Sequence, residues 1–297
     1  MLLRQKKDLS YENLDFPKKD ILSGGNRLSL NYKSKNQNFS IITVVLNNVN
    51  SIEETIKSVI NQTEDLEYII IDGGSDDGTL DIIRKYEKYI NLWISEKDFG
   101  IYDAMNKGIK YSTGNYLGIL NSGDLYNPNA LSIISRYLDE NTNLDFIFGT
   151  VFKKKLKYGF NRKKIYWSFD FYPSHSSGFF ISRIAQKKIG LYNTDFKLSA
   201  DHDLFFRLIK SNFKGTSTKK NEVIGQFRKI DGSFSSKFSF EEHINEEIKI
   251  RLKNNQNKLI ICLIILNNYF RKIFKKKKYS ITFKLTFNLI KHVIKQA

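Results

Sequence analysis

Short apolar runs alternate along the chain with segments in which apolar residues recur every three or four positions. The run FSIITVVL at 39–46 is rich in β-branched residues, which predicts a strand buried on both faces. In the next segment, 51–62, Ile52, Ile56 and Val59 have the spacing of a helix. The same alternation predicts further strands at 66–72, 91–95, 115–120 and 144–152, and further helices at 76–89, 101–112 and 128–138.

Strands and helices that alternate with short links are typical of a doubly wound, mostly parallel sheet, so we predict the α/β class. Residues 1–38 are polar, rich in Lys and Asn, and show no such period, which favours a loosely ordered N-terminal arm. We place the main domain at 39–240 and a basic, amphipathic C-terminal extension, expected to be helical, at 241–297.

Charge separates the extension from the rest of the 297 residues. The chain carries +17, but thirteen Lys and Arg lie from Lys249 onward and no Asp or Glu follows Glu247, so the first 248 residues carry only +4. A basic tail attracts polyanions, either nucleic acid or anionic lipid.

The chain also indicates its compartment. Cys262 is the only cysteine, which excludes an intramolecular disulfide and fits a reducing compartment. The first ten residues lack the apolar run of a signal peptide, and the longest apolar run, 259–266, is far shorter than the roughly 20 residues that cross a bilayer. We therefore expect a cytoplasmic protein.

Ligands of doubly wound sheets bind beyond the carboxyl ends of the strands, and acids stand at several of these ends. Asp72 opens a Gly-rich turn that lacks a dinucleotide fingerprint, and a plain tight turn is the alternative. Asp124 ends the sequence NSGD, where a carboxylate can hold a hard divalent cation against phosphate oxygens, and an Asx turn is the alternative.

Two further segments carry candidate groups. The segment 95–108 contains Asp98, Asn106 and Lys107, which would suit a phosphate or sugar pocket, or a capped amphipathic helix. Asp201 stands where a helical pattern begins, and a carboxylate there is stabilised by the helix N-terminus. A simple helix cap is the alternative for Asp201.

Six blocks, taken in order, resemble the family 2 glycosyltransferases of the GT-A fold, above all those that build bacterial capsule, O-antigen and exopolysaccharide. The resemblance spans about 39–235. The blocks are FSIITVVLNN (39–48), YIIIDGGSDDGT (68–79), SEKDFGIYDAMNKGI (95–109), GNYLGILNSGD (114–124), HSSGFFISR (175–183) and SADHDLFFRL (199–208).

The resemblance implies a nucleotide-diphospho-sugar transferase fold and transfer of a sugar, with inversion, from a nucleotide-sugar, commonly a UDP-sugar, to a hydroxyl of a saccharide or lipid-linked acceptor. It implies that Asp124 holds Mg²⁺ or Mn²⁺ and that Asp201 is the catalytic base. It assigns the donor site to Thr43, Val45, Asn47, Asp72, Asp98, Asn106, Lys107, Ser122 and Gly123.

This sequence departs from the family pattern at three places. Gly73 replaces a second acid after the second strand, Asn121 and Gly123 leave the metal block with one acid, and Ala200 replaces the acid before the base. The metal site is therefore poor in carboxylates, so the diphosphate and water would supply most ligands. Asp203 remains a rival base, and His175 is either a further contact of the diphosphate or acceptor, or a structural histidine.

A different class of function, a non-catalytic module that binds nucleic acid or an anionic membrane, would also use a basic tail. Acids at Asp72, Asp124 and Asp201 would repel nucleic-acid phosphates, so we expect an enzyme and no nucleic-acid partner.

An apolar stripe runs along the tail beside lysines, which is the pattern of a helix that lies in a membrane interface. The stripe consists of Leu259, Leu263, Leu266, Phe270 and Ile273. We expect residues 258–295 to bind an anionic membrane surface, which would make the protein peripheral on the inner face of the plasma membrane. The alternatives are a helix packed back on the main domain and an oligomer interface.

Overall fold

The computed structural model describes residues 12–29, 32, 37–168, 176–228, 239–274 and 283–295, and the side chains of 240, 241, 271–274 and 283–285 are outside the description. His175 and the loop Asp231–Ser235, which resembles a late loop of the family, therefore lie outside the described residues. Two compact units make up the chain. The first unit is Met1–Phe160, Pro173–Thr194 and Phe213–Ile230, and the second is Asn161–Tyr172, Asp195–Asn212 and Asp231–Ala297.

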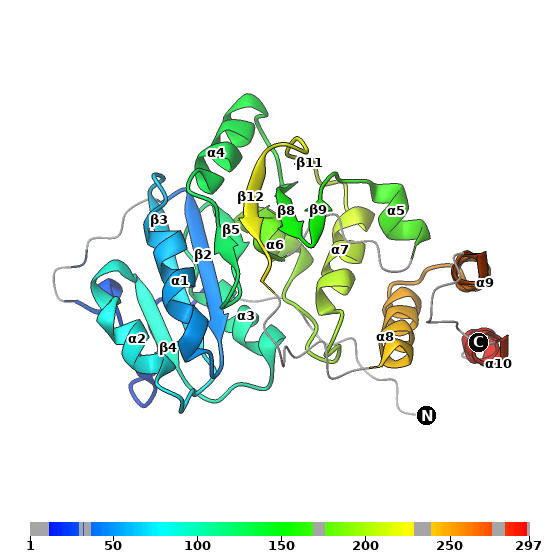
Figure 1. Cartoon of the computed structure of the whole chain (residues 1–297), viewed down its shortest axis with the longest axis horizontal. Helices are drawn as coiled ribbons and strands as arrows, with labels where there is room; N and C mark the ends of the chain where they lie inside the picture. The colour runs from blue at the N-terminus through cyan, green and yellow to red at the C-terminus, as the bar shows by residue number, and fades with distance from the viewer. Residues whose placement is uncertain are drawn as a thin grey trace. The chain divides into compact units, whose positions relative to one another are not determined.

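An eight-stranded sheet in the order β1-β4-β3-β2-β5-β10-β7-β11 forms the centre of the first unit (Figure 1). Every strand of this sheet except β1 and β10 runs in the same direction. The strands are β1 (Leu22–Gly24), β2 (Phe39–Val45), β3 (Leu66–Asp72), β4 (Leu92–Ser95), β5 (Tyr116–Ile119), β7 (Phe146–Phe148), β10 (Phe179–Ser182) and β11 (Gly215–Ser217). The predicted α/β class with a mostly parallel sheet is confirmed.

A second sheet of four strands, in the order β6-β12-β8-β9, belongs to the same unit. Its strands are β6 (Leu125–Tyr126), β8 (Thr150–Lys153), β9 (Lys155–Lys157) and β12 (Val223–Gln226). The helices of this unit are η1 (Asn26–Leu28), α1 (Val49–Ile60), α2 (Thr79–Lys85), η2 (Glu87–Tyr89), α3 (Ile101–Tyr111), α4 (Ala130–Glu140), η3 (Ser176–Gly178) and α6 (Arg183–Ile189).

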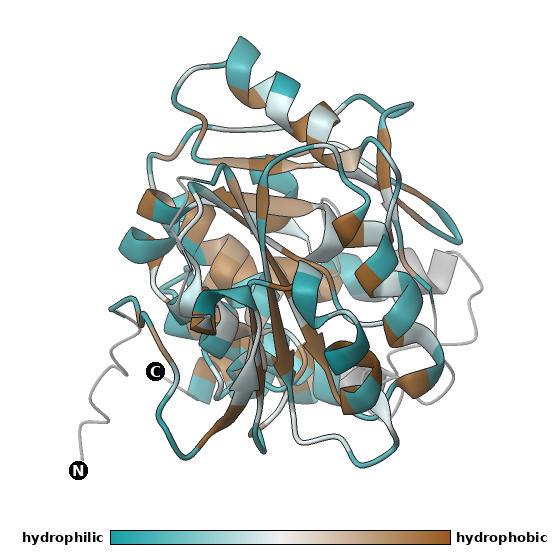
Figure 2. Ribbon diagram, turned by 90° about the vertical axis from the view of Figure 1, so that its left-hand side faces the viewer, coloured by the Kyte–Doolittle hydropathy of each residue, from teal (hydrophilic) through white to brown (hydrophobic). Residues whose placement is uncertain are grey.

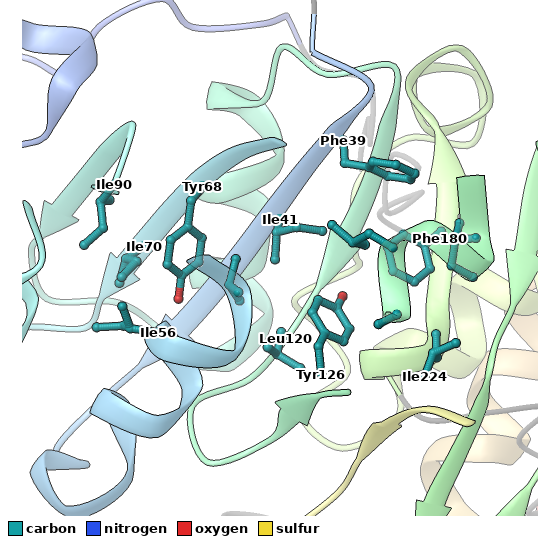
Figure 3. Close-up of a cluster of buried hydrophobic side chains, with 14 of the residues drawn as sticks. Phe39, Ile41, Ile56, Tyr68, Ile70, Ile90, Leu120, Tyr126, Phe180 and Ile224 are labelled. Carbon is teal, nitrogen blue, oxygen red and sulfur yellow. The ribbon is translucent and has the colours of Figure 1, made fainter. Parts of the chain in front are cut away.

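The core explains why these runs form strands. β2 and β3 are buried almost throughout, and Ile41 and Ile70 pack with Ile56 of α1 and with Tyr68 (Figure 3). The strands of the large sheet accordingly carry mainly hydrophobic residues (Figure 2). At roughly 25 cal/mol per Å² of apolar surface removed from water, this burial is the main driving force for the sheet.

Two predicted elements are divided. The run 144–152 forms β7 in the large sheet and β8 in the small one, and the division falls at Gly149. A Cβ at Gly149 would lie 2.1 Å from the Ile224 side chain, so the close approach of β12 requires glycine there. The predicted helix 76–89 is divided into α2 and η2. It begins only at Thr79, because Gly78 adopts a φ of 95° that ends the preceding turn.

The N-terminal arm differs from the expectation of a loosely ordered segment, because part of it is built into the sheet. β1 pairs with β4, and the Arg27 guanidinium forms a buried ion pair with Glu67 of β3. The Glu67 carboxylate also accepts hydrogen bonds from the Thr113 backbone N–H (2.8 Å) and the Ser40 hydroxyl (2.5 Å). A buried charge needs such partners, and they lie too far apart in sequence to form a local pattern.

The second unit is helical in its described part. It contains α5 (Arg162–Trp167), α7 (Ala200–Lys210), α8 (Phe240–Lys253), α9 (Lys258–Phe274) and α10 (Phe283–Lys295). The expected helical tail is confirmed by α9 and α10, which pack on α8 through a cluster of apolar side chains. None of the helices in the described part of the chain is long and apolar enough to cross a membrane.

Candidate active site

The loops after β2 and β3 hold each other at the carboxyl edge of the large sheet. Asn47 adopts a φ of 48°, a left-handed conformation that asparagine tolerates better than most residues. Its backbone N–H donates to the Ser75 hydroxyl (2.8 Å), and its side-chain oxygen accepts from the Asp76 backbone N–H (3.0 Å). These hydrogen bonds fix the two loops to each other, and Asn47 is exposed to solvent.

Asp72 is buried at the end of β3 and holds the loop that follows. The Ser75 hydroxyl (2.5 Å), the Ser75 backbone N–H (3.1 Å) and the Ser95 hydroxyl (2.6 Å) all donate to its carboxylate. Nothing in the sequence singles out Ser95, because only the pairing of β3 with β4 brings it beside Asp72. The visible role of Asp72 is to shape this loop, and its contact with the nucleotide base of a donor stays a prediction.

Thr43 and Val45 point into the core of the first unit. The Thr43 hydroxyl lies 3.1 Å from the Tyr68 hydroxyl, and burial raises the pKa of Tyr68 well above its usual value. Val45 belongs to the main apolar cluster. Both side chains therefore pack rather than face solvent, and a contact of these two residues with a nucleoside stays a prediction.

The NSGD turn after β5 is held by a threonine of α1. The Gly123 backbone N–H donates to the Thr55 hydroxyl (2.8 Å), which in turn donates to the Asp124 carbonyl (3.0 Å). Gly123 has a φ of 94°, a conformation in which a side chain would be strained. Ser122 accepts from the Asn48 amide (3.0 Å), so the turn is also tied to the loop after β2. Nothing in the spacing of α1 singles out Thr55.

Asp124 is only 2% exposed, and one of its carboxylate oxygens accepts from the Arg228 backbone N–H (3.2 Å). The amide oxygen of Asn121, at the other end of the turn, is buried and accepts no hydrogen bond from the described residues. Carboxylate and amide oxygens are the donors that Mg²⁺ and similar hard cations prefer. The oxygen donors of this turn are therefore of the type that suits a divalent cation.

The protein offers such a cation few other ligands. Within the described ranges, no group of three or more His, Cys, Asp and Glu side chains could hold a metal ion. A cation at Asp124 would have to take most ligands from water or from a bound phosphate, as Mg²⁺ commonly does.

The loop between β4 and α3 brings a second carboxylate to this edge. A Cβ built on Gly73 would lie 2.5 Å from Asp98 Oδ2, so the Asp98 carboxylate fills the space where residue 73 would carry a side chain. The other Asp98 oxygen accepts from the Gly100 backbone N–H (2.8 Å). Gly73 replaces an acid of the family pattern, and Asp98 places an acid at the same point. Next to it, Phe99 is 96% exposed and was missed by sequence analysis.

Asn106 and Lys107 of α3 are engaged within the first unit. The Asn106 amide donates to the Tyr192 carbonyl and accepts from the Tyr192 backbone N–H, both at 2.9 Å. Lys107 forms ion pairs with Glu96 (2.8 Å) and Asp103 (3.4 Å). Partial burial lowers the pKa of Lys107, but the bond with Glu96 and the charge of Asp103 outweigh it, so its pKa is raised. Asn106 therefore ties α3 to the chain at Tyr192, and Lys107 holds the β4–α3 segment. Direct contact with a donor stays a prediction for both residues.

Asp201 lies in the second unit, in the first turn of α7. It is partly exposed, and its carboxylate accepts from the His202 backbone N–H (2.9 Å). The Glu246 carboxylate of α8 holds the loop before α7, because it accepts from the backbone N–H groups of Lys197 (2.7 Å), Leu198 (2.8 Å) and Ser199 (2.8 Å). Nothing in the sequence links Glu246, a residue of the predicted extension, to this loop.

Asp203, the rival of Asp201, is buried and committed to other partners. One carboxylate oxygen accepts from Arg207 Nε (2.9 Å) and the other from the Asn254 amide (2.8 Å). A carboxylate in a buried ion pair with both oxygens engaged is poorly suited to take a proton from a ligand. The structure therefore gives Asp203 a structural role.

Buried charges also tie α8 to α5 within the second unit. Arg251 is fully buried and donates to the carbonyls of Tyr166 (2.7 Å) and Ser168 (2.7 Å) and to the Gln256 side chain (2.8 Å). Burial lowers the pKa of this guanidinium. Residues of the predicted extension thus form part of the framework around α7, while the boundary at 240 stays a prediction.

The decisive comparison is with a protein family. The family described as "Glycosyl transferase family 2" matches residues 40–199, which is more than half of the chain. The chain belongs to this glycosyltransferase family. The match contains all the strand-end residues described above.

Named relatives agree with this assignment. An uncharacterized glycosyltransferase of Mycobacterium tuberculosis is 31% identical over 185 residues, which cover 57% of this chain and 67% of that protein. The PGL/p-HBAD biosynthesis glycosyltransferase of Mycobacterium bovis BCG is 29% identical over 203 residues, 65% of this chain and 78% of that protein. An uncharacterized glycosyltransferase of Rickettsia typhi is 26% identical over 277 residues, 83% of this chain and 84% of that protein.

Solved structures show the fold. S. aureus TarS 1–349 in complex with UDP-GlcNAc matches with a TM-score of 0.62 and 17% identity, over 86% of this chain and 80% of that one. Against the longer TarS chain the match covers only 44% of its length. The mannosyltransferase PcManGT of Pyrobaculum calidifontis, in complex with GDP-Man and Mn²⁺, matches with a TM-score of 0.57 and 15% identity, over 75% of this chain and 66% of that one. The glycosyltransferase therefore has the GT-A fold.

Proposed function

We propose that this glycosyltransferase moves a hexosyl or N-acetylhexosaminyl group, with inversion, from a UDP-sugar to a hydroxyl of a saccharide or lipid-linked saccharide in the synthesis of a surface polysaccharide. The observation that carries the proposal is the NSGD turn at the carboxyl edge of the large sheet, which contains the buried carboxylate of Asp124 and the buried amide oxygen of Asn121. The UDP-GlcNAc of the TarS complex supports the choice of donor, and the PGL/p-HBAD biosynthesis in the name of the M. bovis relative supports a role in biosynthesis.

A divalent cation, Mg²⁺ or Mn²⁺, belongs to the proposal. The Mn²⁺ in the PcManGT complex supports it, and Asp124 and Asn121 would hold the ion. When bound, such a cation neutralises the charge that develops on a diphosphate leaving group. Asp98, beside Gly73, and the exposed Asn47 are the side chains that we assign to the rest of the donor.

Asp201 is the proposed base. In an inverting transfer the acceptor oxygen forms a bond to the anomeric carbon, the bond from that carbon to UDP breaks, and UDP leaves with the electron pair. The proton of the acceptor hydroxyl passes to a carboxylate within hydrogen-bond reach, which acts as the general base. Asp201 is partly exposed, whereas Asp203 is buried in an ion pair, and this difference favours Asp201.

A screen of UDP-, GDP- and dTDP-sugars tests the proposal. The purified chain is incubated with each donor in Mn²⁺ or Mg²⁺, and release of the nucleoside diphosphate is measured with and without a chelator. We expect release from at least one UDP-sugar, and the chelator should abolish it. Release from GDP- or dTDP-sugars only would overturn the UDP assignment, and turnover that survives the chelator would overturn the metal.

The fit between Gly73 and Asp98 gives a second test at the donor site. Gly73→Ala should displace the Asp98 carboxylate, because the new Cβ needs its place, and should weaken UDP binding by about tenfold. In an Asp98→Ala background the same substitution should have little further effect, since the two residues are coupled. Titration calorimetry of the four proteins measures this coupling, and additive effects would refute it.

A further inference from the structure

Helix α9 is apolar on more than one side. Its inner side, formed by Ile261, Ile264 and Ile265, is buried in a cluster with side chains of α8 and α10. The other members of that cluster are Ile244, Ile248, Leu289 and Val293. The helix is thus fixed to a small helical core, and this core uses only one side of it.

The opposite side of α9 exposes large apolar side chains in a row. Leu259 is 74% exposed, Leu263 59% and Phe270 51%, and Leu266 between them is partly exposed. Their spacing of four, three and four residues places them along one line of the helix. A surface helix of a globular protein usually has a single apolar stripe, and that stripe faces the core. We call these four residues the outer face of α9.

The sequence that carries this face has charge of one sign. No Asp or Glu follows Glu247, whereas ten Lys and Arg lie between Lys258 and the last residue. In α10, Lys291 and Lys295 are exposed. An apolar face that a partner protein covered would not require an acid-free sequence around it, but an anionic lipid surface attracts such a basic segment.

We infer that the outer face of α9 rests in the headgroup region of a bilayer that contains anionic phospholipid. The inner side keeps the helix on α8 and α10, so the helix lies along the surface. α9 has 17 residues, and no described helix meets the requirements for crossing a membrane. This inference concerns a surface of the second unit and does not depend on the proposed sugar transfer.

Flotation of the full chain with lipid vesicles tests the inference. Vesicles of phosphatidylcholine with phosphatidylglycerol should carry the protein at low salt, and vesicles of phosphatidylcholine alone should carry much less. The double variant Leu259→Ser/Leu263→Ser should bind the anionic vesicles at least about tenfold more weakly, because it removes two apolar side chains that would be buried in the interface.

Matched variants separate the apolar and the charged contributions. Ile184→Ser removes an equally exposed apolar side chain from the first unit and should float like the unaltered chain. Lys291→Gln/Lys295→Gln should weaken binding by about tenfold at low salt and less at high salt. Circular dichroism and donor hydrolysis without vesicles should be unchanged in all of them, which separates a failure here from a failure of the proposed function.

Three results would overturn the inference. The full chain does not float with anionic vesicles, or the double leucine variant floats as well as the unaltered chain, or the leucine variant converts a dimer to a monomer while flotation is unchanged. The third result would assign the outer face to a second copy of this chain, which light scattering of the same samples would show.

Discussion

Replacing Asp201 by Asn is expected to lower turnover by about 10²–10⁴-fold, the range that general base catalysis contributes. Asparagine has nearly the same shape and can still accept from the His202 backbone N–H, so α7 should keep its first turn. What is lost is the ability to take the proton of the acceptor hydroxyl. Binding of UDP should hardly change, and steady-state turnover together with UDP titration measures both quantities.

Two matched variants in the second unit control this result. Asp195→Asn removes an exposed acid that forms an ion pair with Lys253, and should stay active. Asp203→Asn weakens a buried ion pair with Arg207, so it should lower the melting temperature more than it lowers the rate. If Asp203→Asn is folded and inactive while Asp201→Asn is active, the base is Asp203 and the assignment is wrong.

Asp124→Asn should reduce metal-dependent turnover by about 10²–10³-fold, since a Lewis acid at a leaving diphosphate supplies several kcal/mol. The amide can still accept the Arg228 backbone N–H, so the turn should persist. The removed negative charge weakens the hold on the cation, and higher Mn²⁺ concentrations should restore part of the rate. Initial rates over a series of Mn²⁺ concentrations measure this shift.

Asp81→Asn is the control for Asp124→Asn, because its carboxylate is 81% exposed on α2 in the same unit. It should show the unaltered dependence on Mn²⁺. The metal assignment fails if Asp124→Asn has the same rate and the same Mn²⁺ dependence as the unaltered chain.

The fold could be predicted where local pattern decides the structure. The run 66–72 forms β3 with the expected bounds, because a short apolar run rich in β-branched residues and bounded by polar residues favours a strand buried on both faces. Gly149 was not recognised as a break, since its reason is the side chain of Ile224, far along the chain. The N-terminal arm was underestimated for the same kind of reason, because Arg27 is ordered by Glu67.

The site shows the same division. The rule that ligands gather at the carboxyl ends of parallel strands led to Asp72, Asp98 and Asp124 from the sequence alone. The groups that hold them, such as Ser95 and Thr55, could not be found, because strand pairing and helix packing bring them there. A hydrogen-bond partner contributed by another element leaves no periodic signal in the sequence.

In the tail, periodicity predicted the helix but not the use of its sides. Leu259, Leu263 and Phe270 of the stripe are exposed, and the side that packs begins at Ile261. Both sides are apolar, so the sequence alone could not decide between a membrane and a core. The structure assigns one side of α9 to the core and leaves the other side exposed.

The most direct test of the central claim, a metal-dependent donor site at the NSGD turn, is calorimetric titration of UDP into the full chain in the presence of Mn²⁺. The claim predicts saturable binding that a chelator abolishes and that Asp124→Asn weakens by at least about tenfold, a loss of about 1.4 kcal/mol. Binding of equal strength without metal or in Asp124→Asn, or no binding of UDP at all, would contradict it.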